Sequence, residues 1–184
     1  MYKAVLAMLF ITNKLLAVTQ AYTGPIEFGR PATLEELSTY PRTHFPDGEN
    51  LPAGQGNYAE GKQLYQIHCV SCHGPQMKGK AAFNAPRLIG GRGSLKGGDK
   101  PIKTVESFWP HAVSLYDYIS RAMPFLTPKI LTANEVYALC AYILAEAHII
   151  PKTTLMDETS LPKVAMPNKD GFIDPYTKQR KTSI

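Results

Sequence analysis

The pentapeptide at residues 69–73, Cys69-Val70-Ser71-Cys72-His73, constrains this chain more than any other feature of its sequence. Two thiols three positions apart, followed at once by an imidazole, form the C-x-x-C-H pattern of covalent c-type haem attachment. The spacing lets each thiol add to one of the two porphyrin vinyl groups and holds the histidine beneath the ring. The motif therefore predicts one covalent haem c, with Cys69 and Cys72 as thioethers and His73 as an axial iron ligand.

Three other interpretations of these residues remain open from the sequence. A zinc site would need a fourth ligand and usually a second pair of cysteines, and neither is visible. A thioredoxin-like redox pair is expected beside a βαβ unit, and no predicted strand precedes Cys69. A structural disulfide between Cys69 and Cys72 would leave His73 without a role. Haem attachment is the interpretation that we favour.

Iron with one histidine ligand needs either a second protein ligand or an open face. The sequence offers five candidates for that ligand: Met77, His111, Met123, Met156 and Met166. Met123 is the best placed, because Pro124 ends a helix there and leaves the thioether on a loop. Most methionines fill hydrophobic cores, which is the alternative for Met77 and Met156. A thioether ligand would raise the reduction potential and suit one-electron transfer.

The chain has 184 residues, enough for one domain and an additional arm. Hydrophobic residues make up 44% and charged residues 19%, which excludes wholesale disorder, and no apolar run reaches the roughly 18 residues of a membrane-spanning helix. Residues 1–21 are predicted to be a signal peptide, because Lys3 precedes an apolar run and small residues around Ala21 suit cleavage. A buried helix or an uncleaved anchor is the alternative. Export implies a periplasmic protein.

Turn-forming residues dominate residues 22–57, which we predict to be an extended arm over a core. The domain itself is expected to span residues 58–150. It opens with a helix over 58–68, and the Gly-, Pro- and Lys-rich residues 74–110 are expected to form a long loop, which is uncommon unless it is functional. Residues 151–184 return to turn chemistry and are predicted to be a C-terminal extension.

Two further helices follow from the hydrophobic spacing. The first is expected to start at Ser114 and to end at Pro124, with one face formed by Leu115, Tyr118, Ile119 and Ala122. The second opens on a capping box of Thr132 and Glu135, with Leu131 and Val136 placed for a hydrophobic staple. Its core-facing stripe is expected to comprise Val136, Leu139, Cys140, Ile143, Leu144 and Ala147. Pro151 is expected to end this helix, and Cys140 is predicted to be a buried thiol.

Residues 58–150 resemble a class I c-type cytochrome. Gly61 and Tyr65 stand where that family packs a glycine and an aromatic residue of its N-terminal helix, and Leu139 and Tyr142 match their partners on its C-terminal helix. The resemblance implies a mostly α-helical class I cytochrome c fold with irregular N- and C-terminal extensions. In such a fold three or more helices wrap around one covalent haem, and the N- and C-terminal helices cross near-perpendicularly.

The same resemblance implies roles for further residues. Pro86 looks like the family's proline whose carbonyl accepts a hydrogen bond from the proximal histidine, which is His73 here. Met123 falls where the axial methionine of the family does. Arg92 and Trp109 are similar to groups that contact the haem propionates.

A narrower likeness is carried by residues 120–125, 135–139 and 161–172. These segments resemble the cytochrome subunits of bacterial Sox sulfane dehydrogenases and related sulfite dehydrogenases, in which a molybdenum subunit oxidises the sulfur compound and passes electrons to the haem. The likeness implies such a partner here, a downstream cytochrome or oxidase, and a role for residues 152–175 in the fold or the subunit contact. Some of those cytochromes carry two haems, whereas this chain has a single C-x-x-C-H motif.

Residues 74–104 hold seven cationic residues and a single carboxylate, Asp99, so their net charge is +6. The cations are Lys78, Lys80, Arg87, Arg92, Lys96, Lys100 and Lys103. A basic rim of this kind would steer the protein toward acidic partners, and a solvated loop that only maintains solubility is the alternative. Nucleic-acid binding is a poor match, because aromatic residues are nearly missing from this stretch.

The sequence thus predicts an exported monohaem cytochrome that moves single electrons for a molybdenum sulfite or sulfane dehydrogenase subunit. A freestanding electron shuttle is the first alternative. A haem enzyme or gas sensor with an open iron is the second. Membrane contact is expected only if residues 1–21 remain attached.

Overall fold

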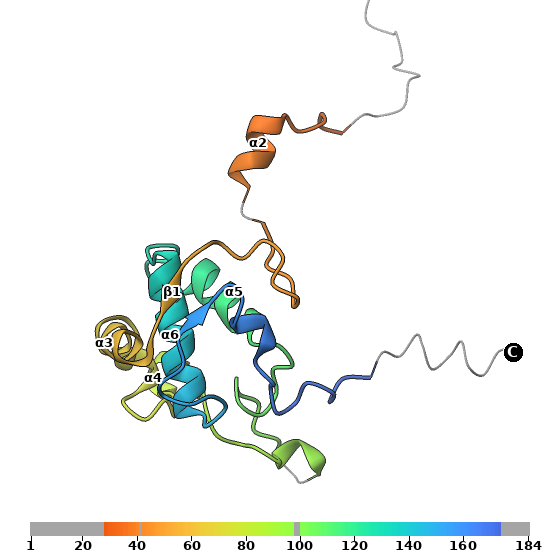
Figure 1. Cartoon of the computed structure of the whole chain (residues 1–184). Helices are drawn as coiled ribbons and strands as arrows, with labels where there is room; N and C mark the ends of the chain where they lie inside the picture. The colour runs from red at the N-terminus through yellow and green to blue at the C-terminus, as the bar shows by residue number, and fades with distance from the viewer. Residues whose placement is uncertain (1–27, 41, 98–99, 174–184) are drawn as a thin grey trace, which may run out of the picture. The chain divides into compact units, whose positions relative to one another are not determined.

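The structure, a computed structural model, describes residues 28–40, 42–97 and 100–173 (Figure 1). The chain divides into two compact units, residues 1–41 and residues 42–184. The predicted signal peptide, residues 1–21, lies outside the described residues. Among the helices of the described part, none is long and apolar enough to cross a membrane.

In the first unit, helix α2 (Leu34–Thr39) lies inside the segment predicted to be an extended arm. The Thr33 hydroxyl accepts a hydrogen bond from the Glu36 amide (3.2 Å), and the Glu36 carboxylate accepts one from the Thr33 amide (2.8 Å). Glu36 also pairs with Arg30, 2.5 Å away. The prediction of an extended arm was wrong for these six residues, because the capping box at Thr33 starts a helical turn among the prolines.

The second unit is mostly helical, as predicted (Figure 1). Its described elements are β1 (Gln55–Gly56), α3 (Tyr58–His68), α4 (Val70–His73), α5 (Val113–Ala122), α6 (Ala133–Glu146) and β2 (Met156–Asp157). Three short 3-10 turns complete it: Ala81–Phe83, Ser94–Lys96 and Leu161–Lys163. Helix α3 has the predicted bounds. The described part of residues 74–110 is a long loop, also as predicted, with two of these turns in it.

Helix α6 forms the centre of the core (Figure 1). It begins in the predicted capping box of Thr132 and Glu135. Residues 136–145 are all buried, so the helix is enclosed on every side and not only along the predicted stripe. The reason is that α3, α5, β1 and β2 all contact it. Cys140, with no exposed surface, is confirmed as a buried thiol.

The end of α6 differs from the prediction. The helix stops at Glu146, well before Pro151. His148 takes a left-handed conformation with φ of 54°, which a continuing helix does not allow. The turn at Ala147 and His148, and not the proline, therefore ends the helix.

Helices α3 and α6 pack without side chains between them at one point. A Cβ atom at Gly61 would lie 1.9 Å from the carbonyl oxygen of Ala138, and one at Gly56 would lie 2.3 Å from the Ala138 nitrogen. Only glycine permits this approach. Beside it, the rings of Tyr65 and Tyr142 lie 5.4 Å apart, which agrees with the helix pairing that the family resemblance implies.

The core face of helix α5 is only partly the predicted one: Leu115 and Ile119 are buried as predicted, whereas Tyr118 is half exposed and Ala122 only partly buried. It begins at Val113, and its buried residues are Val113, Leu115, Tyr116 and Ile119. In place of Tyr118, the neighbouring Tyr116 packs on Tyr137 with ring centroids 4.6 Å apart. The prediction counted i, i+3 and i+4 spacings from Leu115. Of these the i+4 contact at Ile119 is buried, and the i, i+3, i+6 row of Val113, Tyr116 and Ile119 completes the face.

The C-terminal segment belongs to the fold over residues 156–166. Strand β2 pairs antiparallel with β1, with Gln55 opposite Asp157 and Gly56 opposite Met156. Met156, Leu161 and Met166 are buried in the hydrophobic core. The two-stranded sheet thus pairs β1, which precedes helix α3, with β2, which follows helix α6.

Candidate functional site

The three residues of the C-x-x-C-H motif lie on one short helical turn at the end of α3. Cys69 is both the C-cap of α3 and the N-cap of α4. Its carbonyl accepts hydrogen bonds from the amides of Cys72 (3.2 Å) and His73 (2.8 Å), while its own amide donates to Tyr65. The turn therefore holds both thiols and the imidazole in a fixed order relative to α3.

Both thiols of the motif are free and partly buried, so the structure holds no disulfide between them. Burial, and then the neighbouring charge of Cys72, raise the pKa of the Cys69 thiol to about 11. A redox-active or zinc-binding pair needs thiolates, which a lowered pKa supplies. In the described residues, moreover, no group of three or more His, Cys, Asp or Glu side chains is placed to hold a metal ion. A raised pKa is the opposite of what a thioredoxin-like pair or a zinc site would use.

The His73 ring has a defined orientation. Its Nδ1 atom lies 2.9 Å from the carbonyl oxygen of Pro86. A carbonyl oxygen only accepts, so Nδ1 is the donor, and in the neutral ring Nε2 then keeps its lone pair. This is the hydrogen bond that the family resemblance implies, and it leaves His73 with the nitrogen that a metal ion would take.

Hydrogen bonds from the following loop hold this arrangement. The Gly79 amide donates to the His73 carbonyl (2.9 Å), and the Leu88 amide donates to the Met77 carbonyl (2.8 Å). A Cβ atom at Gly79, where φ is +76°, would lie 2.4 Å from the Ala85 carbonyl oxygen. Glycine is therefore required where the loop turns back to place Pro86 against His73.

Sequence reasoning missed a second support of the motif. The Tyr65 hydroxyl, with the whole residue buried, donates a 2.7 Å hydrogen bond to the carbonyl of Gly74, the residue after His73. Burial raises the pKa of Tyr65, so the phenol stays protonated as the donor that this bond needs. Tyr65 and Gly74 are nine residues apart, so no local sequence pattern indicates that they meet. The one available signal was that a tyrosine buried in a core needs a hydrogen-bond partner for its hydroxyl.

The five candidates for a second axial ligand fall into two groups. Met77, Met156 and Met166 are buried among the protein's own core side chains, and the Met156 sulfur accepts a hydrogen bond from Ser160. Met123 and His111 are only partly buried. A thioether enclosed by core side chains has no room for a metal ion and its porphyrin, so three candidates are disfavoured.

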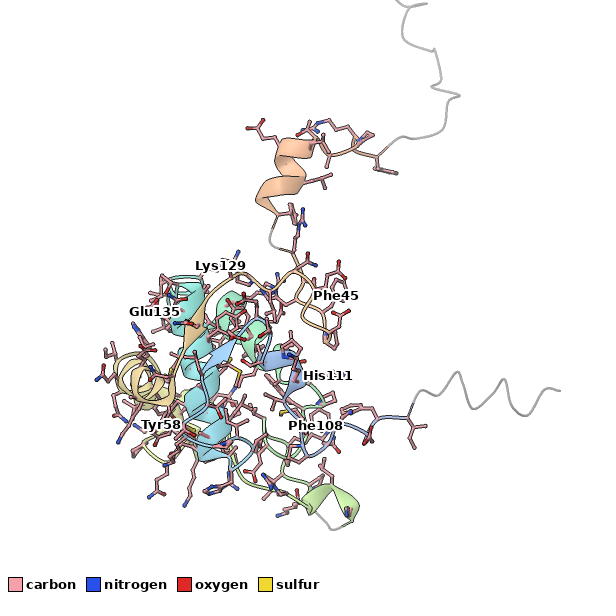
Figure 2. The ribbon with its side chains drawn as sticks, in the orientation of Figure 1. Phe45, Tyr58, Phe108, His111, Lys129 and Glu135 are labelled. Carbon is pink, nitrogen blue, oxygen red and sulfur yellow. The ribbon has the colours of Figure 1, made fainter. Side chains whose placement is uncertain are left out.

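Met123 and His111 flank helix α5. Met123 is its C-terminal cap, where the amide bonds to Ile119 and the chain leaves the helix toward Pro124 in an extended conformation. Its side chain packs against the edge of the hydrophobic core. His111 precedes the helix, and its carbonyl accepts from Ser114. In Figure 2 it lies near Phe108, on the other side of α6 from Tyr58.

The two residues expected at the propionates have other contacts. Arg92 donates from Nε to Glu106 (3.0 Å) and from Nη2 to the Ala147 carbonyl at the end of α6 (2.9 Å). Trp109 packs edge-on against Tyr118, with ring centroids 5.9 Å apart, and lies partly buried against the core. Glu106, which sequence reasoning did not single out, also accepts a 2.5 Å hydrogen bond from the Gly90 amide. Arg92 and Glu106 thus tie the loop to α6.

Comparisons with known proteins agree with this geometry. A protein-family profile described as cytochrome c oxidase, cbb3-type, subunit III, matches residues 56–143. Among solved structures, the crystal structure of the sulfane dehydrogenase SoxCD from Paracoccus pantotrophus is similar, with 33% sequence identity and a TM-score of 0.73. The match covers 87% of this chain and 79% of that one. No curated protein matches the chain.

Proposed function

This chain belongs to the class I c-type cytochromes, and from that premise we propose that it accepts single electrons from a molybdenum-containing sulfite or sulfane dehydrogenase subunit in the periplasm. Its family binds haem c covalently and transfers electrons. When bound, the haem iron supplies the one-electron change between its ferric and ferrous forms. The likeness to SoxCD over most of the chain supports the sulfur-oxidising context.

The residues of the motif have distinct roles in this proposal. Cys69 and Cys72 form the thioethers, and His73 donates the Nε2 lone pair to iron. The observation that carries the assignment is the 2.9 Å contact of His73 Nδ1 with the Pro86 carbonyl. It selects one tautomer, orients the ring and makes the opposite nitrogen a better donor.

Met123 is the proposed second ligand. It is partly buried at the end of α5, whereas the other three candidate methionines are enclosed by the core. A thioether ligand favours the ferrous state and raises the reduction potential. It also closes the iron to outside ligands, as an electron carrier requires.

Trp109 and Arg92 are proposed to bind the propionates. The indole N–H of Trp109 is a donor only, which suits a carboxylate. Arg92 uses two of its five N–H donors for Glu106 and Ala147, so three remain for a propionate. Replacement of Trp109 by Phe is then expected to alter the pH dependence of the reduction potential without loss of the haem.

The ligand assignment is tested with the full chain, exported and matured in a bacterial host. Met123→Ala is expected to lower the reduction potential strongly and to let carbon monoxide bind the ferrous protein. Met166→Leu, a buried and volume-conserving change, is the matched control and should alter neither property. Carbon monoxide binding by the unaltered protein, or an unchanged potential in Met123→Ala, would contradict the assignment.

The partner is tested separately. A tagged chain purified from its native source should bring with it a molybdenum-containing subunit, and sulfite or thiosulfate should then reduce the haem. If the cytochrome always elutes alone and neither compound reduces it in crude extract, the dehydrogenase role is wrong. The haem assignment would be unaffected by that result.

A further inference from the structure

Helix α5 carries an ion pair on its last two turns. Arg121 donates a hydrogen bond from Nε to Oδ1 of Asp117, which lies 2.8 Å away and one helical turn earlier. Both side chains are partly buried, with 29% and 26% of their surface exposed. A pair of this kind within one helix contributes little to stability by itself. Its importance therefore depends on what else the two side chains bind.

Both side chains also bind the backbone of residues 42–44. A second nitrogen of Arg121, Nη2, donates a hydrogen bond to the Arg42 carbonyl. Asp117 Oδ1 accepts a hydrogen bond from the His44 amide, 3.2 Å away. The partners in these two bonds are 79 and 73 residues apart along the chain, so the ion pair fastens a distant segment to α5.

The attached segment has a defined structure of its own. His44 donates from Nδ1 to the Asn50 carbonyl (2.8 Å), and the Asn50 side-chain amide donates to the Thr43 carbonyl (3.1 Å). The His44 ring also packs edge-on against Tyr116 of α5, with ring centroids 5.2 Å apart. Residues 42–50, which we call the bracing segment, therefore form a closed loop to which α5 is held.

The bracing segment is attached at the end of α5 that leads to Met123. Arg121 lies in the last turn of the helix, and Met123 is the C-cap. The amide of Met123 bonds to the Ile119 carbonyl (3.1 Å) within that turn. Beyond it, Phe125 and Leu126 are 79% and 87% exposed, so the chain that follows Met123 provides little packing. The position of Met123 thus depends on the last turn of α5, and helix ends open more readily than helix centres.

We propose that Asp117 and Arg121 are positioning residues for Met123. By tying the last turn of α5 to the bracing segment, they hold the thioether in place and slow its departure from the iron. The inference rests on the proposed assignment of Met123 as the second axial ligand. Neither residue is proposed to touch the haem, so their effect on it is transmitted through Met123.

Two variants break the pair from either side, in the full chain exported and matured in a bacterial host. They are Asp117→Asn and Arg121→Gln. The matched control is Glu146→Gln at the end of α6, where the carboxylate is 30% exposed and binds Lys152 (2.9 Å) and the Tyr58 hydroxyl (2.7 Å). Each carboxylate has one ion pair and one further hydrogen bond, so replacement by the amide removes the same kind of contact at both places.

The rate at which imidazole binds the ferric protein measures how fast Met123 leaves the iron, because the site must open before imidazole can enter. At saturating imidazole this rate is expected to rise about tenfold in both pair variants, which is the effect of losing one hydrogen bond to a charged group. The control should change it less than about twofold. The double variant should exceed either single variant by less than about twofold, since the two side chains act as one unit. The reduction potential should fall in the pair variants, because a less firmly held thioether favours the ferrous state less.

Arg121→Lys is the second variant, and it decides the question where the first two do not attach haem. It keeps the cation but has one nitrogen in place of the two that bind Asp117 and the Arg42 carbonyl. Its imidazole rate should be about threefold above that of the unaltered protein, because only part of the contact is lost.

Unchanged imidazole rates in the pair variants, or an equal rise in Glu146→Gln, would overturn the positioning role, since the pair would then only stabilise the fold. An unchanged rate in Arg121→Lys would do the same. If the unaltered protein binds imidazole as fast as Met123→Ala does, the iron has no second protein ligand. That result would contradict the proposed function itself, and it is distinct from a failure of the positioning role alone.

Discussion

Addition of one methyl group at Gly61 is expected to destabilise the fold, although alanine is the better helix former. The new Cβ would lie 1.9 Å from the Ala138 carbonyl oxygen, 2.5 Å from its carbon and 2.8 Å from Tyr142 Cβ. A tolerable contact needs at least 3.0 Å, so the helices would have to separate by about 1.1 Å at this point. The obstacle is the backbone of the buried helix α6, which cannot move aside as a flexible side chain can.

The two effects have opposite signs, which makes the prediction sharp. Helix propensity alone would stabilise Gly61→Ala by about 1 kcal/mol, whereas overpacking costs about 3 kcal/mol. We therefore expect a net loss of about 2 kcal/mol in the free energy of unfolding. Guanidinium unfolding of the haem-loaded full chain, followed by far-ultraviolet circular dichroism, measures it.

Gln63→Ala, an exposed change on the same helix, is the matched control and should shift the free energy by no more than about 0.5 kcal/mol. A Gly61→Ala protein as stable as the original, or more stable, would refute the close contact of α3 with α6. Failure of the variant both to fold and to attach haem would support the close contact, because α3 leads directly into the attachment motif.

Three further predictions concern the supports of the site. Tyr65→Phe should lower the free energy of unfolding by about 1 to 2 kcal/mol, since the buried Gly74 carbonyl loses its donor. The haem spectrum would remain, and an unchanged stability would mean that the hydroxyl bond is unimportant. Glu106→Gln should cost about 1 kcal/mol through its bonds to Gly90 and Arg92, again measured by denaturant unfolding. Asp157 has a pKa lowered from 3.8 to about 2, first by the Ser160 amide. Its contribution to stability is complete above about pH 4 and is lost as the pH falls toward 2. In Asp157→Asn that part of the pH dependence of unfolding should disappear, and an identical pH profile would contradict the prediction.

Several elements were predictable because their signals are local. The bounds of α3, the capping box of α6 and the C-x-x-C-H turn each depend on residues within about one helical turn of one another. The capping box of α2 at Thr33 is a local signal of the same kind, and the prediction of an extended arm did not use it.

Other features depend on which segments meet, and periodicity carries no information about that. Tyr118 and Tyr116 are both aromatic neighbours on α5, and only the position of α6 decides that Tyr116 is the buried one. The burial of Met166 likewise follows from the path of residues 156–166, which begins where Met156 and Asp157 pair with β1.

The sequence by itself determined the chemistry of the site, because covalent attachment needs two thiols and an imidazole at fixed neighbouring positions. It did not determine the orientation of that imidazole. The Pro86 carbonyl meets His73 across 13 residues only because the loop turns at Gly79. The partly buried place of Met123 depends in the same way on how α5 packs against α6. Covalent attachment depends on neighbouring residues and can be predicted from them. Burial and hydrogen-bond partners depend on which distant segments pack together, and the tertiary structure alone decides that.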